Sequence, residues 1–290
     1  MIVDTHTHLV SEDPERYPLQ PAGLPGKWYL EAPVSAERML ERMDENGVDR
    51  AVAVQPMGAY SYDNRYAADS AERFPERLAG VCCVDVRSPD ALSELDLWIG
   101  RRRMQGLRLF ALAPEGESWL SEPATFPVWE RVADLGVPLI ATVFSHQLAE
   151  LGRVLERFRD LPVLLDHCGF PQLHGPGWTS SGPLLDGPRW DSVRPLFDLA
   201  DKPNLYLKVS THVLDEAERV GELRDFVAAL AERFGSRRLM WGSDFPQTHD
   251  RSYAQLVDWG RQGFSGLAPE DRDQVLGRTA LGFWPPPGPQ

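Results

Sequence analysis

Residues 2–8 read Ile-Val-Asp-Thr-His-Thr-His, a short apolar run that passes directly into alternating histidines. Side chains alternate between the two faces of a strand, so His6 and His8 are expected on one face. Seven more short runs rich in Val, Ile or Leu follow, as in strands that are buried on both faces. The eight predicted strands are Ile2–Thr5, Arg50–Val54, Leu78–Val84, Gly106–Phe110, Val137–Phe144, Pro162–Asp166, Leu205–Ser210 and Arg238–Trp241.

Amphipathic stretches with helical spacing separate these runs. Two clear examples are Ala36, Met39, Leu40, Met43 and Leu148, Leu151, Leu155, Phe158. Ser35 and Ser88-Pro89 are predicted to begin helices, and Gly47, Gly136 and Gly235 to end them. Eight strand–helix units without a linker favour a single α/β domain, a (β/α)8 barrel over residues 1–284, rather than an open doubly wound sheet. Residues 285–290 are rich in proline and are predicted to form a frayed tail.

Two connections are long for a compact barrel, one after the first strand and one after the sixth. Val10–Pro33 contains Trp28, and Phe170–Arg189 contains Trp178 among many glycines and prolines. Loops of this length usually cover a functional site, although a surface insertion is the alternative.

The composition restricts the partners. The chain has 290 residues with 30 Lys and Arg against 43 Asp and Glu, a net charge of −13. That balance repels phosphate backbones and acidic membranes, so a small-molecule substrate is expected rather than nucleic acid or a membrane. Three cysteines do not make a disulfide framework, and we expect Cys82, Cys83 and Cys168 to pack in the core. No leader sequence is recognised, so a cytoplasmic location is expected, and the oligomeric state is left open.

Polar residues end several of the apolar strands. The first strand ends in His6 and His8, the sixth in Asp166 and His167, and the eighth runs into Asp244. In a (β/α)8 barrel the carboxyl ends of the strands share one mouth, which is where catalytic groups lie. Several titratable groups at one mouth predict a functional site there.

The ordered set of these motifs resembles the amidohydrolase-2 branch of the amidohydrolase superfamily. Within it, the chain is similar to the lactonase group that includes 2-pyrone-4,6-dicarboxylate and sugar-acid lactonases. The residues that carry the resemblance are Asp4–His8, Gly47–Arg50 through Pro56, Asp63-Asn64, Gly106–Leu109, Leu165–Pro171, Asn204–Ser210 and Trp241–Pro246.

The resemblance implies that Asp244 is the general base that activates water, and that His6, His8 and His167 polarise the scissile carbonyl. It also implies that Arg108 holds a substrate carboxylate, for which a guanidinium is well shaped. An ion pair with an acidic neighbour inside the barrel is the alternative for Arg108. Further substrate contacts are expected from Lys208, Ser210, Trp28 and Asn64, with a barrel-closing salt bridge as the alternative for Lys208.

The metal-dependent members of the superfamily have a histidine ligand at the end of the fifth strand, where this chain has Thr142. His6, His8 and Asp244 are still enough for weak zinc binding, because a catalytic zinc takes three protein ligands and water. His146 supplies a further ligand only if the strand ends in a bulge. We therefore expect that zinc is possible but that no metal is required.

The leading hypothesis is hydrolytic opening of a lactone, one that carries a carboxylate. One alternative is a metal-dependent decarboxylase of an aromatic or unsaturated acid, which the same branch contains. Another is a catalytically silent barrel that binds a small acid. His146, His174, His212 and His249 are expected on surface loops, with their roles open.

Overall fold

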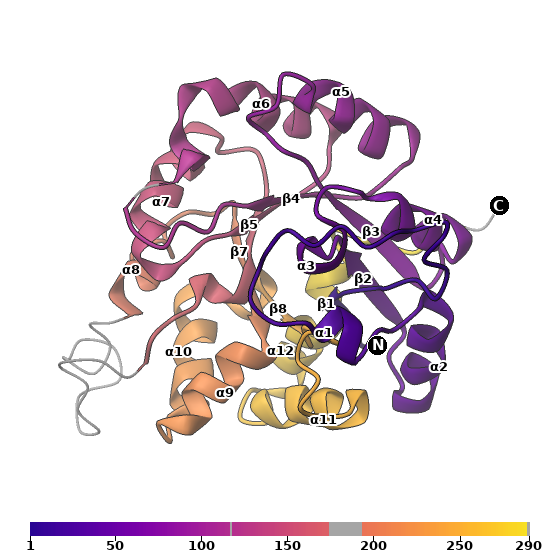
Figure 1. Cartoon of the computed structure of the whole chain (residues 1–290). Coiled ribbons are helices and arrows are strands. Elements are labelled where there is room, and N and C mark those ends of the chain that lie inside the picture. Colours follow the sequence, from indigo (N-terminus) through magenta and orange to yellow (C-terminus); the bar gives the residue numbers. More distant parts are fainter. Residues whose placement is uncertain (117, 174–192, 289–290) are drawn as a thin grey trace.

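The computed structural model describes residues 1–116, 118–173 and 193–288. Eight parallel strands form one sheet in the order β1 to β8, and helices surround them (Figure 1). The strands are β1 (Val3–Thr7), β2 (Arg50–Val54), β3 (Leu78–Cys83), β4 (Leu107–Phe110), β5 (Leu139–Thr142), β6 (Val163–Leu165), β7 (Leu205–Ser210) and β8 (Leu239–Gly242).

The sheet closes where the last strand meets the first. Thr7 forms a parallel bridge with Phe245, just after β8. The Thr5 hydroxyl donates to the Trp241 carbonyl at 2.7 Å, and the Ser243 amide donates to Asp4 Oδ1 at 2.8 Å. The predicted (β/α)8 barrel is therefore confirmed, and its closing seam lies beside the histidines of β1.

The helices form the outer ring of the barrel in Figure 1. The α-helices are α1 (Trp28–Glu31), α2 (Ala36–Asn46), α3 (Met57–Tyr60), α4 (Arg65–Arg73), α5 (Ala91–Leu95), α6 (Phe126–Leu135), α7 (Leu148–Arg157), α8 (Arg194–Phe197), α9 (Thr211–Arg219), α10 (Leu223–Phe234), α11 (Tyr253–Gly263), α12 (Pro269–Asp273) and α13 (Thr279–Leu281). Two π-helical turns, η1 (Asp96–Arg101) and η8 (Gln274–Arg278), follow α5 and α12. Short 3-10 turns are η2 (Trp119–Ser121), η3 (Pro123–Thr125), η4 (Ser145–Gln147), η5 (Asp166–Gly169) and η7 (Ser236–Arg238).

Most of the predicted helix boundaries agree with the structure. The Ser35 hydroxyl caps α2 by accepting from the Arg38 amide, and Gly47 ends that helix at a φ of 65°. Gly136 ends α6 in the same left-handed conformation, which glycine adopts without steric cost. The prediction at Ser88-Pro89 was early, because α5 begins only after Asp90.

Two layers of apolar side chains hold the barrel together. The inner layer fills the barrel and includes Val52, Val81, Ile140 and Met240, with Trp284 fully buried beneath them. The outer layer packs the strands against the helices, and its side chains alternate with the inner ones along each strand. A filled interior leaves the ends of the barrel as the places where a ligand can bind.

The structure corrects two strand boundaries near the predicted site. Strand β1 extends to Thr7 rather than Thr5, so His6 lies within the strand and not after it. Strand β6 ends at Leu165, one residue early, because Asp166 begins the turn η5. No helix in the described ranges is both long and apolar enough to span a bilayer.

Candidate active site

The closing seam of the barrel brings His6, His8 and Asp244 together. His6 lies in β1, His8 follows that strand directly, and Asp244 follows β8. Asp244 Oδ1 lies 3.3 Å from His8 Nε2 and 3.6 Å from His6 Nε2. All three side chains are buried, with Asp244 the most accessible at 6% exposure. The two-residue spacing of His6 and His8 in the sequence thus predicts the histidine pair. Closure of the barrel brings the carboxylate of Asp244 to it.

The partners of the outer ring nitrogens determine which nitrogens carry protons. His8 Nδ1 lies 2.9 Å from the Val54 carbonyl oxygen, which can only accept, so Nδ1 is protonated. His6 Nδ1 lies 3.2 Å from Asp166 Oδ1, close in distance but too oblique for a full hydrogen bond. In the neutral rings both Nε2 atoms are then unprotonated, and their lone pairs face Asp244 Oδ1. Three acceptor atoms therefore converge, and such a group needs a proton or a cation between them.

His167 reaches the same site from an unusual turn. His167, Cys168, Gly169 and Phe170 all have positive φ values, between 51° and 73°. Left-handed backbone at non-glycine residues is costly and concentrates at functional sites. The turn places the His167 ring 4.8 Å from the ring of His6, centre to centre. His167 Nδ1 pairs with the Ser210 hydroxyl at 2.8 Å, so the expected substrate contact Ser210 lies behind the histidine.

Asp166, noted at the end of the sixth strand but assigned no role from the sequence, is the central anion of the site. It lies 3.2 Å from His6 Nδ1 and 3.2 Å from Lys208 Nζ. Its second oxygen accepts from Arg108 Nε at 2.8 Å and from the Thr142 hydroxyl at 2.7 Å. A carboxylate at the end of an apolar run, directly before a histidine, was the signal in the sequence. Thr142 is thereby committed to Asp166, which explains why β5 contributes no metal ligand.

Arg108 and Lys208 have different positions relative to the mouth. Lys208 is fully buried, between Asp166 and the Trp284 ring at 5.6 Å, so the structure gives it the salt bridge that was the alternative to a substrate contact. Arg108 also forms its alternative ion pair, but through Nε. Among the described residues nothing accepts from its two terminal nitrogens, and the side chain is 4% exposed. Those nitrogens are left to bind an anion.

Burial and neighbouring charges set the protonation of the site. Burial raises the pKa of Asp244, but the close contact with His8 and the nearby His167 and His6 outweigh it and hold the pKa well below its usual range. Burial lowers the pKa of His167 to about 4 and that of His6 well below its ordinary value. Burial also opposes ionisation of Asp166, but Lys208, His6 and Arg108 hold its pKa well below the usual range. Near neutral pH both carboxylates are ionised and the His6 and His167 imidazoles are neutral.

Trp28 and Asn64, two predicted substrate contacts, have structural partners. Trp28 lies in α1 with its ring 5.5 Å from that of His8, in a tilted stack. The Asn64 amide bonds the main chain of Cys83 on both sides, at 2.8 Å, and the Tyr62 carbonyl at 3.0 Å. Asn64 therefore joins α4 to β3, and its contact with substrate stays a prediction. Trp28 packs beside His8.

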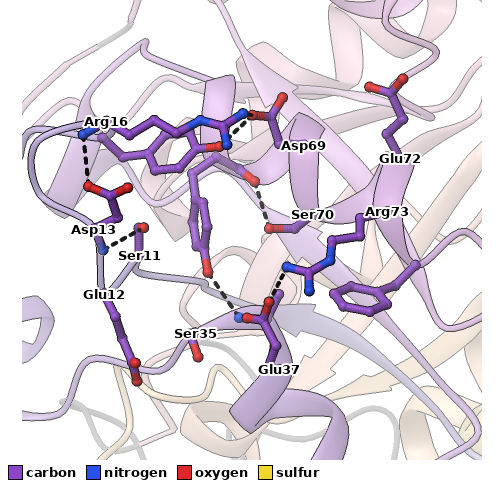
Figure 2. Close-up of a pocket in the computed structure, with 14 residues that line it drawn as sticks. Ser11, Glu12, Asp13, Arg16, Ser35, Glu37, Asp69, Ser70, Glu72 and Arg73 are labelled. Atoms are coloured by element: carbon purple, nitrogen blue, oxygen red, sulfur yellow. Dashed lines mark hydrogen bonds and ion pairs between the residues drawn. The ribbon is translucent and has the colours of Figure 1, made fainter.

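The long loop that carries Trp28 is anchored at the outer surface. Tyr17 in this loop donates to Asp69 of α4 at 2.5 Å, and Arg16 contacts the same carboxylate at 3.0 Å. Figure 2 shows this contact at one side of a surface cavity of about 670 Å³, and an ion pair between Arg73 and Glu37 at the other. Figure 1 shows the indigo loop crossing the barrel end beside β1. These contacts hold the loop over the site.

The remaining histidines lie at or beyond the rim. His146 and His212 are exposed and line a cavity of about 540 Å³ beside Phe170. His212 was expected on a loop, but it lies in the first turn of α9 because β7 passes directly into that helix. His249 is exposed and pairs with Glu31 at 3.1 Å. His174 and most of the predicted loop 170–189, including Trp178, lie outside the described residues.

Cys168 packs in the core, as predicted, and a left-handed turn places it there. It is fully buried, and its thiol lies 3.6 Å from the Lys208 carbonyl oxygen. Strand alternation does not direct it there, because Cys168 belongs to the left-handed turn η5. Burial raises the pKa of its thiol above the ordinary value, which suits a packing role.

The donor set fits a divalent metal ion. His6 Nε2 and Asp244 Oδ1 are buried without a hydrogen-bond partner. Together with His8 Nε2 they form a group of potential ligand atoms within 4.8 Å of one another. The outer nitrogens of both rings are held by a carboxylate and a carbonyl, the usual support for ligating histidines. Two imidazoles and one carboxylate are a suitable set for zinc.

Comparison with known proteins places this geometry in a family. The family model described as amidohydrolase matches residues 3–285. A curated relative, L-fucono-1,5-lactonase of Burkholderia ambifaria, is 26% identical over 259 residues, covering 87% of this chain and 84% of that protein.

Two solved structures share the fold of this chain. An amidohydrolase of Burkholderia multivorans with bound zinc has a TM-score of 0.76 at 22% identity, covering 99% of this chain and 100% of that one. A probable 2-pyrone-4,6-dicarboxylic acid hydrolase of Acinetobacter baumannii with citric acid bound has a TM-score of 0.75 at 18% identity, covering 98% of both chains. At these sequence identities, the similarity shows that the chains share a fold.

Proposed function

The chain belongs to the amidohydrolase family and is a hydrolase, and from that premise we propose that it opens a lactone by attack of water. The observation that carries the proposal is the position of Asp244 Oδ2. Asp244 Oδ1 faces the two imidazoles of β1, whereas Oδ2 has no hydrogen bond to any described residue. An ionised carboxylate with one free oxygen at the mouth is placed to take a proton from water. The lactonase relative supports this choice of bond.

The reaction divides between the residues of the site. Asp244 Oδ2 removes a proton from water as the oxygen attacks the lactone carbonyl carbon. The ring C–O bond then breaks, and the leaving oxygen takes the proton from Asp244, which gives a hydroxy acid and returns Asp244 to its ionised form. If Ser210 donates to His167 Nδ1, the Nε2–H of His167 donates to the carbonyl oxygen as negative charge develops there.

Arg108 is the group proposed to select the substrate. Its Nε is fixed by Asp166 and Thr142, so the guanidinium is held in place before substrate arrives. The two terminal nitrogens match the two oxygens of a carboxylate. This favours a lactone that carries a carboxylate near the scissile bond.

A metal ion, if bound, would be held by His6, His8 and Asp244 and would polarise the carbonyl as a Lewis acid. The residues that take the proton and hold the substrate are present without it. We expect metal below one equivalent after purification and activity that survives prolonged chelation.

The test combines a lactone panel with metal removal. Purified protein is assayed on carboxylated and neutral lactones, before and after dialysis against a chelator, with metal content measured by elemental analysis. Turnover of a carboxylated lactone at a similar rate in both samples supports the proposal. One tightly held zinc, with activity lost on its removal and regained on its return, would overturn the metal-independent reaction and favour the decarboxylase or metallohydrolase alternative. Absence of turnover on every lactone and acid would leave the silent acid-binding barrel.

A further inference from the structure

A second cavity lies at the opposite end of the barrel from the catalytic residues. Its volume is about 950 Å³. Arg50 and Leu78, the first residues of β2 and β3, line it, as do residues that precede β4 and β5. It is therefore at the amino-terminal ends of the strands. Residues 285–288 form another part of its wall.

The lining of this cavity has the opposite charge to the rest of the protein. It includes four arginines, Arg50, Arg101, Arg102 and Arg103, and one carboxylate, Glu72. The chain as a whole carries a net charge of −13. A local excess of positive charge on an acidic protein attracts anions to that place.

Three of the four arginines have no carboxylate in contact. Arg102 is paired with Asp69 at 2.5 Å and with Glu72 at 3.2 Å. Arg101 and Arg103 are exposed, and neither forms an ion pair within the described part of the chain. Arg50 is buried and donates its terminal nitrogens to the main-chain oxygens of Pro75 and Leu78. Among the described residues its Nε has no hydrogen-bond partner, and its charge interacts with Glu76 without an ion-pair contact.

The helix that precedes the arginines explains only some of them. Arg101 ends the π-helical turn η1, and basic residues at a helix end interact favourably with its carbonyl groups. Arg50 comes from β2, 51 positions earlier (101 − 50 = 51), and has no part in that helix. The convergence of two separate segments on one cavity points to a ligand.

The floor of the cavity is apolar. Leu78, Ile99 and Met104 line it and are themselves at least nine-tenths buried, and Pro285–Pro287 add a further apolar wall. An inorganic anion would use the arginines but leave this surface unfilled. We propose that the cavity binds a small organic acid with a flat apolar body and two carboxylates, at a site separate from the catalytic residues.

The test uses phthalate as the probe, with its uncharged dimethyl ester and inorganic sulfate as comparisons. Binding to the full chain is measured by isothermal titration calorimetry. Replacing Arg101 and Arg103 by glutamine together should weaken phthalate binding by about tenfold or more, because both replacements remove charge-assisted contacts to its carboxylates. The matched control is Arg159→Gln with Arg237→Gln, which changes the net charge equally at exposed arginines that do not line the cavity. It should leave the affinity within about twofold.

Each other outcome counts against the proposal. Equal weakening in the two double variants would show a general effect of surface charge. Binding that disappears in Arg108→Met but survives in the Arg101/Arg103 variant would place the acid in the catalytic mouth. Sulfate that binds as well as phthalate would reduce the site to an inorganic anion site, and failure of phthalate to bind the folded wild type would remove the site. Melting temperatures of all variants confirm that they are folded.

Discussion

The two oxygens of Asp244 have different surroundings, and this difference is the basis of the proposed chemistry. Oδ1 faces the imidazoles of His6 and His8, whereas Oδ2 is free to take a proton. Asp244→Asn keeps the shape of the side chain but removes the base. We expect a folded protein with kcat lowered by at least about a hundredfold, the lower range for general base catalysis. Steady-state kinetics with circular dichroism checks this, and normal turnover in the folded variant would end the role of Asp244.

Arg108 has one nitrogen bonded inside the barrel and two without an acceptor among the described residues, so its effects on structure and on binding need to be separated. In Arg108→Met, KM for a carboxylated lactone should rise more than KM for its neutral ester, because only the acid loses a charge-assisted pair. The neutral ester measures any damage caused by loss of the contact with Asp166. Equal changes for both substrates would make Arg108 a purely structural residue.

Among the elements, β1 and β8 approach each other most closely where the site is formed. A Cβ added at Gly242 would lie 2.8 Å from His6 Cβ and 3.1 Å from the His6 amide nitrogen. Gly242→Ala should therefore displace β1, lower the free energy of unfolding by about 1–3 kcal/mol and reduce activity about tenfold or more. Gly100→Ala is the control, because nothing lies within 4 Å of its added Cβ. Chemical denaturation and kinetics measure both variants, and similar results for the two would contradict the packing argument.

The strands also show which parts of the fold and of the candidate site can be predicted from sequence patterns. Strands β2 and β7 were predicted to the residue, because the Ala and Val run of β2 ends before Gln55-Pro56 and the alternating pattern of β7 ends where α9 begins. The end of β6 was missed because the chain enters a left-handed turn at His167. A turn of this kind at non-glycine residues produces no regular spacing of apolar residues that the sequence would reveal. The His6, His8 and Asp244 group follows from strand alternation and barrel order. Asp166 was missed because its role depends on contacts across the barrel with Lys208 and Arg108, which no local pattern contains.

At the scale of the whole molecule, buried titratable groups make stability depend on pH. His167 has its pKa lowered to about 4, so its contribution to the free energy of unfolding is complete above pH 6.5 and is lost as the pH falls toward 4. Asp4 has its pKa raised to about 6 by burial, so its contribution is complete below pH 3.8 and is lost as the pH rises through 6. Each shift corresponds to about 3 kcal/mol, so the two nearly offset between pH 4 and 6.

His6 determines the sign of the result, because its lowered pKa acts in the same direction as that of His167. The free energy of unfolding should therefore be lower at pH 5 than at pH 7. Urea denaturation at the two values measures it. Asp4→Asn should make the difference larger, since it removes the group that opposes the two histidines. Equal or greater stability at pH 5 would contradict this assignment.

The seam between the first and last strands has a consequence for how the protein acquires activity. Asp4 and Ser243, which join at the seam, are 239 positions apart, so the loop that closes between them is nearly the whole chain. Contacts this distant in sequence carry the largest closure entropy and form slowly compared with local helices. During synthesis the histidine pair emerges before the other seven strands, and its carboxylate partner follows only after the last of them. In a refolding experiment, helical circular dichroism should therefore recover before catalysis, and the lag between them measures the time needed to close the ring.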